Sequence, residues 1–286
     1  MAQWQQGSRW LLKKKVAIVL RTALFTDRYD QLLKTREFLA VSQKIEMASE
    51  LNAVITGASS GIGRAIATAI ASTGGSVCLV GRDPGRLETV AKLVRATARS
   101  VLIHEADLNV DAAIEGLAQR LRREFTALDT LVNCAGTFST GTLEKTPVQQ
   151  LDILYQTNLR LPFALTQALL PLLKSRQGQI VFINSSQGLQ ARGNTGPFAA
   201  TQHALKAMTD SLRQEVNADG IRVLSIYPGR TATPRMKTLY EIEGRAYQPQ
   251  LLLQPEDIAQ VALNALLLPR TAEVTNIEIR PLIKSY

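Results

Sequence analysis

The chain has 286 residues, 45% of them hydrophobic, which is enough to bury a large core and fits one α/β domain with an extension. Its formal net charge is +9, but residues 1–46 carry nine Lys or Arg against four Asp or Glu, so the rest of the chain is only mildly basic. No stretch interleaves basic and aromatic residues as a nucleic-acid groove would, so we expect no nucleic-acid partner. The two cysteines, Cys78 and Cys134, lie in apolar runs and indicate reduced thiols in a cytoplasmic protein, and no Cys/His spacing predicts a metal site.

Residues 1–46 form a basic segment whose role the sequence leaves open. The apolar run from Val16 to Leu20 is too short for a secretory signal or a membrane span, because Arg21 follows it at once. The segment could be a mobile extension, it could lie outside the true protein if Met47 is the start, or it could form a basic helix on an anionic surface. We expect one of the first two, because the charges are not segregated to one helical face.

From Leu51 onward, apolar runs alternate with segments of helical spacing, which is the pattern of βαβ units in a parallel sheet. The sequence predicts strands at 53–56, 76–80, 100–105, 130–133, 179–184, 222–226 and 276–279. Helices are expected near 61–72, 85–96, 110–123, 147–173, 198–217 and 255–267. Residues 47–286 are therefore predicted to form an α/β domain: a Rossmann-like doubly wound sheet of seven parallel strands with helices on both faces, a three-layer α/β/α sandwich. Its ligand crevice should lie at the carboxyl ends of the strands.

A glycine-rich stretch lies between the first expected strand and the first expected helix. Gly57 permits a tight turn, Gly61 lets a diphosphate approach the backbone, and Gly63 lets helix and strand pack closely. The helix N-terminus adds unpaired N–H groups and a positive dipole end, so the stretch predicts a dinucleotide site. The same residues also spell G-x-S-x-G around Ser59, the pattern of a hydrolase nucleophile, but no Asp and His follow in the required order.

The second expected strand is followed by Gly81-Arg82-Asp83, where an NAD site would place a carboxylate to accept from the ribose 2′-hydroxyl. The guanidinium of Arg82 instead suits a 2′-phosphate, because it can form two charge-assisted hydrogen bonds with it. NADP(H) is therefore expected in preference to NAD(H). In the alternative interpretation, Arg82 is a solvated turn residue paired to Asp83.

The spacing T-G-x-x-x-G-x-G from Thr56 to Gly63 is followed by N-x-A-G at 133–136, by Ser186 and by P-G-x-x-x-T at 228–233. In this order the motifs resemble the short-chain dehydrogenase/reductase family, and the resemblance covers Leu51 to about Ile279. Asp107 matches a carboxylate that meets the adenine amino group, although it could instead cap the following helix. The cofactor-binding residues that the resemblance implies are Thr56, Gly57, Ser59, Ser60, Gly61, Ile62, Gly63, Arg82, Asp107, Leu108, Asn133, Ala135, Gly136, Gln202, Pro228, Gly229, Thr231 and Thr233. Cys134 replaces the second Asn of the family's N-N-A-G and is interpreted as a packing variant.

The family carries its chemistry on a Ser after the fifth strand and on a Tyr-x-x-x-Lys in the next helix. A phenol can protonate the carbonyl oxygen if a lysine four residues later lowers its pKa. Here Ser186 matches the Ser, and Asn158 matches a helix Asn that holds a water in the proton relay. Phe198 and Gln202 occupy the Tyr and Lys positions. The resemblance therefore implies an NADP(H)-binding oxidoreductase for carbonyl or alcohol hydride transfer with an atypical active site, or alternatively a catalytically silenced nucleotide-binding, regulatory or structural homologue.

Three other residues could deliver the missing proton: His203, Tyr155 and Tyr240. Residues 235–250 are expected to form a loop or short helix that closes over the pocket, with Met236, Leu239 and Tyr240 facing a small-molecule substrate that the sequence does not identify. The resemblance also implies a homodimer or homotetramer that associates through the long helices beginning near Pro147 and Phe198.

Overall fold

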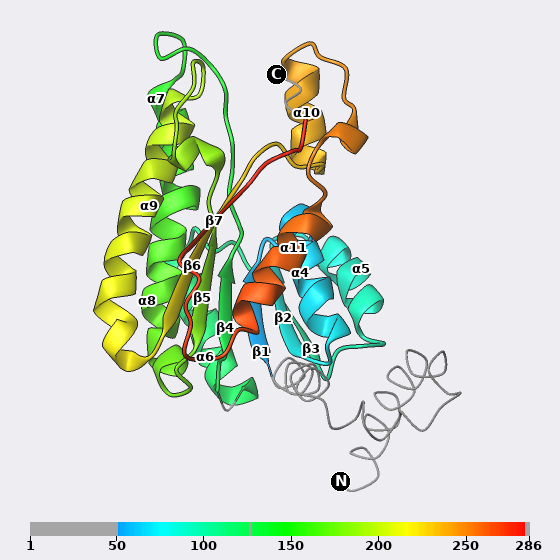
Figure 1. Cartoon of the computed structure of the whole chain (residues 1–286), viewed down its shortest axis with the longest axis vertical. Coiled ribbons are helices and arrows are strands. Elements are labelled where there is room, and N and C mark those ends of the chain that lie inside the picture. The colour runs from blue at the N-terminus through cyan, green and yellow to red at the C-terminus, as the bar shows by residue number, and fades with distance from the viewer. Residues whose placement is uncertain (1–50, 126, 284–286) are drawn as a thin grey trace, which may run out of the picture. The chain divides into compact units, whose positions relative to one another are not determined.

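The computed structural model describes residues 51–125 and 127–283 (Figure 1). The expectations for residues 1–46 concern a segment outside these described residues. In the described ranges, no helix combines the length and the apolar character that crossing a membrane would require.

Seven parallel strands form one sheet in the order β3-β2-β1-β4-β5-β6-β7. The order reverses at β1, which pairs with β2 on one side and with β4 on the other. A reversal of this kind opens a crevice outside the carboxyl ends of the two central strands. The strands are β1 (Asn52–Thr56), β2 (Ser76–Gly81), β3 (Val101–Glu105), β4 (Thr130–Asn133), β5 (Gln179–Ile183), β6 (Arg222–Pro228) and β7 (Asn276–Ile279).

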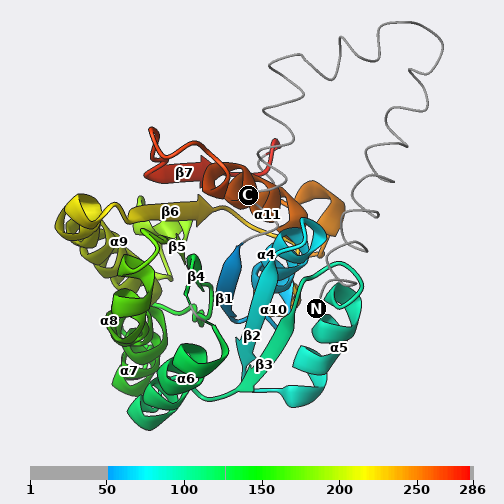
Figure 2. The same ribbon diagram turned by 90° about the horizontal axis from the view of Figure 1, so that it is seen from below.

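Helices cover both faces of the sheet, as Figure 2 shows from below. The helices are α4 (Gly61–Ser72), α5 (Pro84–Val94), α6 (Asp111–Glu124), α7 (Val148–Tyr155), α8 (Leu161–Lys174), α9 (Gly196–Val216), α10 (Pro234–Ile242) and α11 (Pro255–Leu266). One apolar core joins the sheet to α4, α5 and α11, and a second joins the opposite face to α6, α8 and α9. Because both faces are covered, the central strands are almost continuously buried.

The predicted fold is confirmed, and the strands end within about two residues of the expected bounds. The segment expected as one helix at 147–173 is helical from 148 to 174, but its middle turn departs from α-helical geometry. It consists of α7 and α8 joined by a π-helical turn, Gln156–Arg160. The extra residue in this turn directs Asn158 inward, where its side chain bonds to Thr137 and Thr201.

Arg222 anchors the end of α11 and the loop after it to the start of β6. Its guanidinium donates to the carbonyl oxygens of Leu266 at 3.1 Å, Leu268 at 3.0 Å and Ala272 at 2.9 Å. Burial lowers the pKa of Arg222. A single side chain thus satisfies carbonyl groups that the end of a helix leaves without partners.

Arg222→Met is expected to lower the free energy of unfolding by about 2 kcal/mol, because it removes the hydrogen bonds to the Leu266, Leu268 and Ala272 carbonyl groups, of which, among the described residues, only that of Leu266 keeps another donor, Gln179. Urea unfolding followed by circular dichroism measures this. Lys174→Met is the matched control, since it breaks the half-exposed ion pair with Asp219 and should change the free energy by less than about 1 kcal/mol. Equal effects of the two substitutions would contradict the anchoring role of Arg222.

Candidate functional site

A pocket of about 1110 Å³ lies at the carboxyl ends of the strands. Its wall is built from segments that follow β1, β2, β3, β4, β5 and β6, and from the first two turns of α10. It contains all the predicted cofactor-binding residues except Asn133, together with Ser186, Asn158 and Phe198. Asn133 lies behind the wall: it is buried at the end of β4, and its side-chain amide donates to Thr166 of α8 at 3.2 Å. Asn133 therefore holds the strand in place rather than lining the pocket.

The glycine turn between β1 and α4 is held against the end of β4. Gly57 and Gly61 have positive φ angles of 65° and 51°, which favour glycine. A Cβ on Gly63 would lie 2.4 Å from the carbonyl oxygen of Gly57, so the helix can pack this closely only without a side chain. Thr56 accepts hydrogen bonds from the backbone N–H groups of Cys134 and Ala135 at 2.9 and 3.0 Å. The turn is thus fixed by the neighbouring strand.

The first turn of α4 presents its N–H groups to this pocket. Ser60 is the N-cap residue, but its side chain makes no capping hydrogen bond. The first turn carries no acidic side chain either. Backbone N–H donors and a positive dipole end at a helix N-terminus fit the phosphate groups of a ligand.

One end of the pocket is lined by Arg82 and Asp107. The alternative pairing of Arg82 with Asp83 does not occur, because Asp83 caps α5 through the N–H of Arg86 at 2.9 Å and also contacts the Arg86 guanidinium at 3.2 Å. Arg82 is exposed and, within the described residues, makes no ion pair. Asp107 is not a helix cap, since α6 begins after Val110. Its carboxylate instead accepts from the backbone of Asn109 at 3.1 Å.

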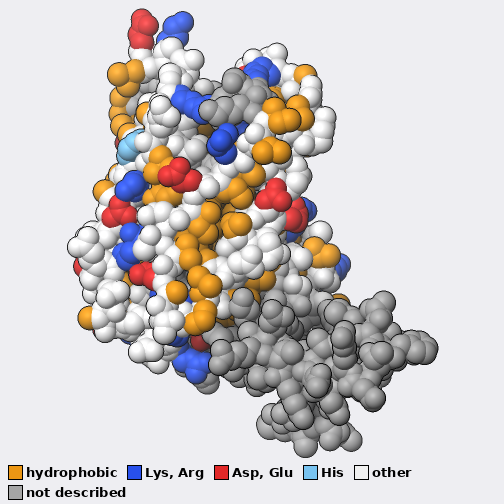
Figure 3. All heavy atoms as spheres, in the orientation of Figure 1, with side chains coloured by type: hydrophobic (Ala, Val, Ile, Leu, Met, Phe, Trp, Pro, Cys, Tyr) orange, Lys and Arg blue, Asp and Glu red, His pale blue; other side chains and the backbone are white. Residues whose placement is uncertain are grey.

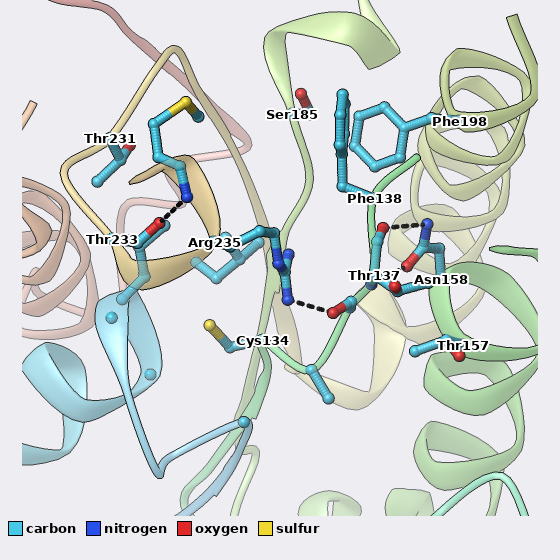
Figure 4. A pocket seen from close by; sticks show the side chains of 18 of the residues that line it. Cys134, Thr137, Phe138, Thr157, Asn158, Ser185, Phe198, Thr231, Thr233 and Arg235 are labelled. Carbon is cyan, nitrogen blue, oxygen red and sulfur yellow. Dashed lines mark hydrogen bonds between the residues drawn. The ribbon is translucent and has the colours of Figure 1, made fainter. Parts of the chain in front are cut away.

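The opposite end of the pocket is aromatic. The rings of Phe138 and Phe198 meet edge to face with their centroids 4.7 Å apart, as Figure 4 shows. Gln202 is buried one turn further along α9, and its carbonyl oxygen accepts from Asn184 at 3.1 Å. Both serines after β5 line the pocket: Ser186 begins a short 3-10 helix, and Ser185 caps it by accepting from the N–H of Gln187 at 3.1 Å.

Asn158 ties the loop after β4 to α9. Its Oδ1 accepts from the N–H of Thr137 at 2.7 Å, and its Nδ2 donates to the Thr137 carbonyl at 3.0 Å and to the Thr201 hydroxyl at 3.3 Å. Figure 4 shows this contact beside the aromatic pair. Asn158 therefore orders the floor of the pocket.

The segment after β6 closes one side of the pocket. Thr233 caps α10 by accepting from the N–H of Met236 at 3.2 Å. Arg230 forms a two-point ion pair with Glu243 at 2.7 and 2.8 Å, and the hydrogen bonds from Arg230 lower the pKa of Glu243. Met236 and Leu239 line the pocket as expected. The expectation for Tyr240 is wrong: its ring is buried and lies under the guanidinium groups of Arg230 and Arg245, at 4.9 and 5.2 Å.

The three alternative proton donors all lie away from the pocket wall. Tyr155 is 49% exposed on the surface of α7, and the ring of His203 bonds back to the carbonyl of Ala199 at 2.9 Å. Tyr240 is covered by the two arginines. In the described part of the chain, no tyrosine, histidine or lysine lines the pocket. Cys134 does line it, but burial raises the pKa of its thiol to about 12, which suits a packing residue.

Sequence reasoning missed several residues of the wall, among them Ser185, Phe138, Arg192 and Arg235. Ser185 directly precedes Ser186, the serine that the sequence analysis matched to the family. The spacing between Ser185 and Phe198 could have identified Ser185 as a second candidate. The other three lie in loops or at a helix start, where no local pattern indicates the direction of a side chain.

A model of the family described as short chain dehydrogenase matches residues 51–244. The chain belongs to this family. A relative described as an uncharacterized oxidoreductase of Staphylococcus epidermidis is 34% identical over 230 residues, which cover 80% of this chain and 96% of the relative.

Solved structures of similar fold include alcohol dehydrogenase from Thermococcus sibiricus complexed with 5-hydroxy-NADP. It has a TM-score of 0.74 and 26% identity, and the match covers 82% of this chain and 97% of that one. L-sorbose reductase from Gluconobacter frateurii, complexed with NADPH and L-sorbose, has a TM-score of 0.74 and 27% identity, covering 80% and 96%. The resemblance found in the sequence is thus confirmed at the level of the family.

Proposed function

We propose that this short chain dehydrogenase binds NADP(H), in preference to NAD(H), along the pocket at the carboxyl ends of the strands. The observation that carries the proposal is the continuity of the wall from Arg82, past the N-terminus of α4, to Gln202 and Thr233. The glycine turn fits a diphosphate, because Gly57, Gly61 and Gly63 leave the backbone bare and the α4 N–H groups carry no side-chain cap. Two of the similar structures were solved with 5-hydroxy-NADP and with NADPH, which supports the same class of ligand here.

The proposed cofactor contacts fall into three groups along the pocket. The diphosphate and the adenosine contact Thr56, Gly57, Ser59, Ser60, Gly61, Ile62, Gly63, Asp107 and Leu108. Arg82 holds the 2′-phosphate. The nicotinamide half contacts Ala135, Gly136, Gln202, Pro228, Gly229, Thr231 and Thr233.

We further propose that Phe198 and Gln202 stand at the family's Tyr and Lys positions and make the active site atypical. When bound, NADPH supplies a hydride for a carbonyl group. This chain contributes Ser185 and Ser186, whose hydroxyls can polarise a carbonyl oxygen, and Asn158, which orders the loop beside them. Since no phenol, imidazole or ammonium of the described residues lines the pocket, solvent water delivers the proton and reduction is slow.

A second function is favoured by the same aromatic wall. Phe138 and Phe198 pack edge to face at the position where reduction would need a proton donor. This arrangement suits a catalytically inactive homologue that binds the nucleotide and regulates a partner protein. NADPH fluorescence during titration tests binding in both cases. A panel of aldehydes, ketones, quinones and enones then separates slow turnover from none.

We propose that residues 235–250, which include most of α10 and the segment after it, form the substrate lid. Residues 47–286 form the proposed nucleotide-binding domain.

We also propose a homodimer or homotetramer, because α7 and α8 expose Val148, Leu151, Ile153 and Phe163. Figure 3 shows a further run of hydrophobic side chains over the region of β7 and α11. Sedimentation analysis of the purified protein measures the oligomeric state.

Arg82→Ala is expected to raise the Kd for NADPH about tenfold or more and to leave the Kd for NADH unchanged, because only NADPH carries the 2′-phosphate that the guanidinium binds. Fluorescence titration of both nucleotides measures this. Lys92→Ala removes an exposed charge from α5, outside the pocket wall, and should change neither Kd. An equal loss of affinity for NADPH and NADH would show that Arg82 does not bind the 2′-phosphate.

A further inference from the structure

Arg235 joins two walls of the pocket that come from distant parts of the chain. It is the second residue of α10, and its Nη2 donates to the carbonyl oxygen of Gly136, which follows β4. Figure 4 shows its side chain extending from α10 past Cys134 to this carbonyl. A ligand that runs along the pocket between β1 and β4 therefore meets the guanidinium.

The surroundings place Arg235 next to the N-terminus of α4. Burial raises the pKa of Cys134, and the charge of Arg235 and the backbone N–H of Gly63, in the first turn of α4, oppose this rise. Thr233, two residues before Arg235, packs against the glycine turn: a Cβ on Gly61 would lie 3.0 Å from its methyl group. Arg235 thus belongs to the same pocket wall as the glycine turn before α4 and the end of β4.

The positive charge of Arg235 has no carboxylate partner among the described residues. The acidic side chains of the described pocket wall are Asp107 and Glu243, and Glu243 is already paired with Arg230 and Arg245. The Arg235 side chain is exposed to solvent; nearby protein atoms lower its pKa, but a guanidinium remains charged at neutral pH. The guanidinium and the positive end of the α4 dipole together create a site that favours an anion.

We propose that Arg235 is a diphosphate-binding residue, whose guanidinium exchanges the Gly136 carbonyl for a diphosphate oxygen when the dinucleotide binds. The inference rests on the proposed function and adds to it a ligand contact from α10. Because NADPH and NADH share the diphosphate, Arg235 strengthens the binding of both. It also links the position of the lid helix to the presence of the nucleotide.

The test compares Arg235→Met and Arg235→Lys with wild type, using NADPH, NADH and inorganic pyrophosphate. Arg235→Met is expected to raise the Kd of both nucleotides about tenfold, since it removes a charge-assisted hydrogen bond. Arg235→Lys keeps the charge and should recover part of the loss. Pyrophosphate should compete with NADPH on wild type and compete about tenfold less well on Arg235→Met.

Lys237→Met is the matched control, because it removes one exposed charge from the same helix at a position outside the pocket wall. Its Kd values should stay within about twofold of wild type. Circular dichroism checks that each variant is folded.

The outcomes separate this inference from the proposed function. If wild type binds NADPH and Arg235→Met binds it equally well or more tightly, the diphosphate role is wrong while the proposed function stands. If wild type binds neither nucleotide, the proposed function fails and this inference fails with it. A loss confined to NADPH would assign Arg235 to the 2′-phosphate and would also overturn the proposal.

Discussion

The double substitution Phe198→Tyr/Gln202→Lys is expected to raise NADPH-dependent reduction of at least one small ketone or aldehyde by about 10²-fold or more. The two residues lie four apart on α9 and both line the pocket. A phenol at 198 would face the pocket beside Ser185, and an ammonium at 202 would lower its pKa. Loss of NADPH absorbance with the carbonyl panel measures the rate.

The single substitutions and one misplaced phenol serve as controls. Phe198→Tyr alone should give a smaller gain, because nothing lowers the pKa of the new phenol. Gln202→Lys alone should destabilise the fold, because Gln202 is only 4% exposed and a buried charge without a partner is unfavourable. Phe138→Tyr places a phenol on the facing ring and should not raise turnover. If the double change instead abolishes a robust wild-type activity, Phe198 and Gln202 serve a different chemistry and the silencing hypothesis is wrong.

The strands could be predicted because each central strand is a short apolar run, buried on both faces and bounded by turn residues. Val54 and Ile55 of β1 pack on opposite faces, in the two different cores, which requires a sheet covered on both sides. The π-helical turn between α7 and α8 could not be predicted. It directs Asn158 toward Thr137, and this contact joins residues that are far apart in the sequence.

The candidate site also contains features that the sequence predicts and features that it does not. The turn from Gly57 to Gly63 is formed by neighbouring residues, so the spacing of its glycines is enough to predict its geometry. The position of the Arg235 side chain depends on its hydrogen bond to Gly136, a residue that follows a different strand. Tyr240 was expected in the pocket because it lies in the lid segment, but contacts with Arg230 and Arg245 hold its ring away from the wall. A linear pattern cannot reveal such pairings.

Gly63→Ala is expected to lower the free energy of unfolding by about 3 kcal/mol and to raise the Kd for NADPH at least about tenfold. The added Cβ would lie 2.4 Å from the carbonyl oxygen and 2.8 Å from the carbonyl carbon of Gly57, and 3.2 Å from the nitrogen of Ala58. These are backbone atoms, so no side-chain rotation relieves the clash. The helix must move away from the turn, and its N–H groups then no longer point at the diphosphate. Urea unfolding and NADPH titration measure the two effects.

Gly116→Ala provides the matched control, because Gly116 lies within α6 and a Cβ there, apart from its chain neighbours and the adjacent α6 backbone, meets no atom within 4 Å. This change should stabilise the fold by about 0.5–1 kcal/mol, since alanine restricts the unfolded chain and favours a helix. A glycine-to-alanine substitution is thus expected to lower the free energy of unfolding at Gly63 and to raise it at Gly116. The difference arises from the close approach of α4 to the glycine turn. If Gly63→Ala unfolded like wild type and bound NADPH normally, the packing of α4 against Gly57 would not shape the diphosphate site. If it lost stability but kept its affinity, the turn would support the fold alone, and the nucleotide would have to be held elsewhere along the pocket.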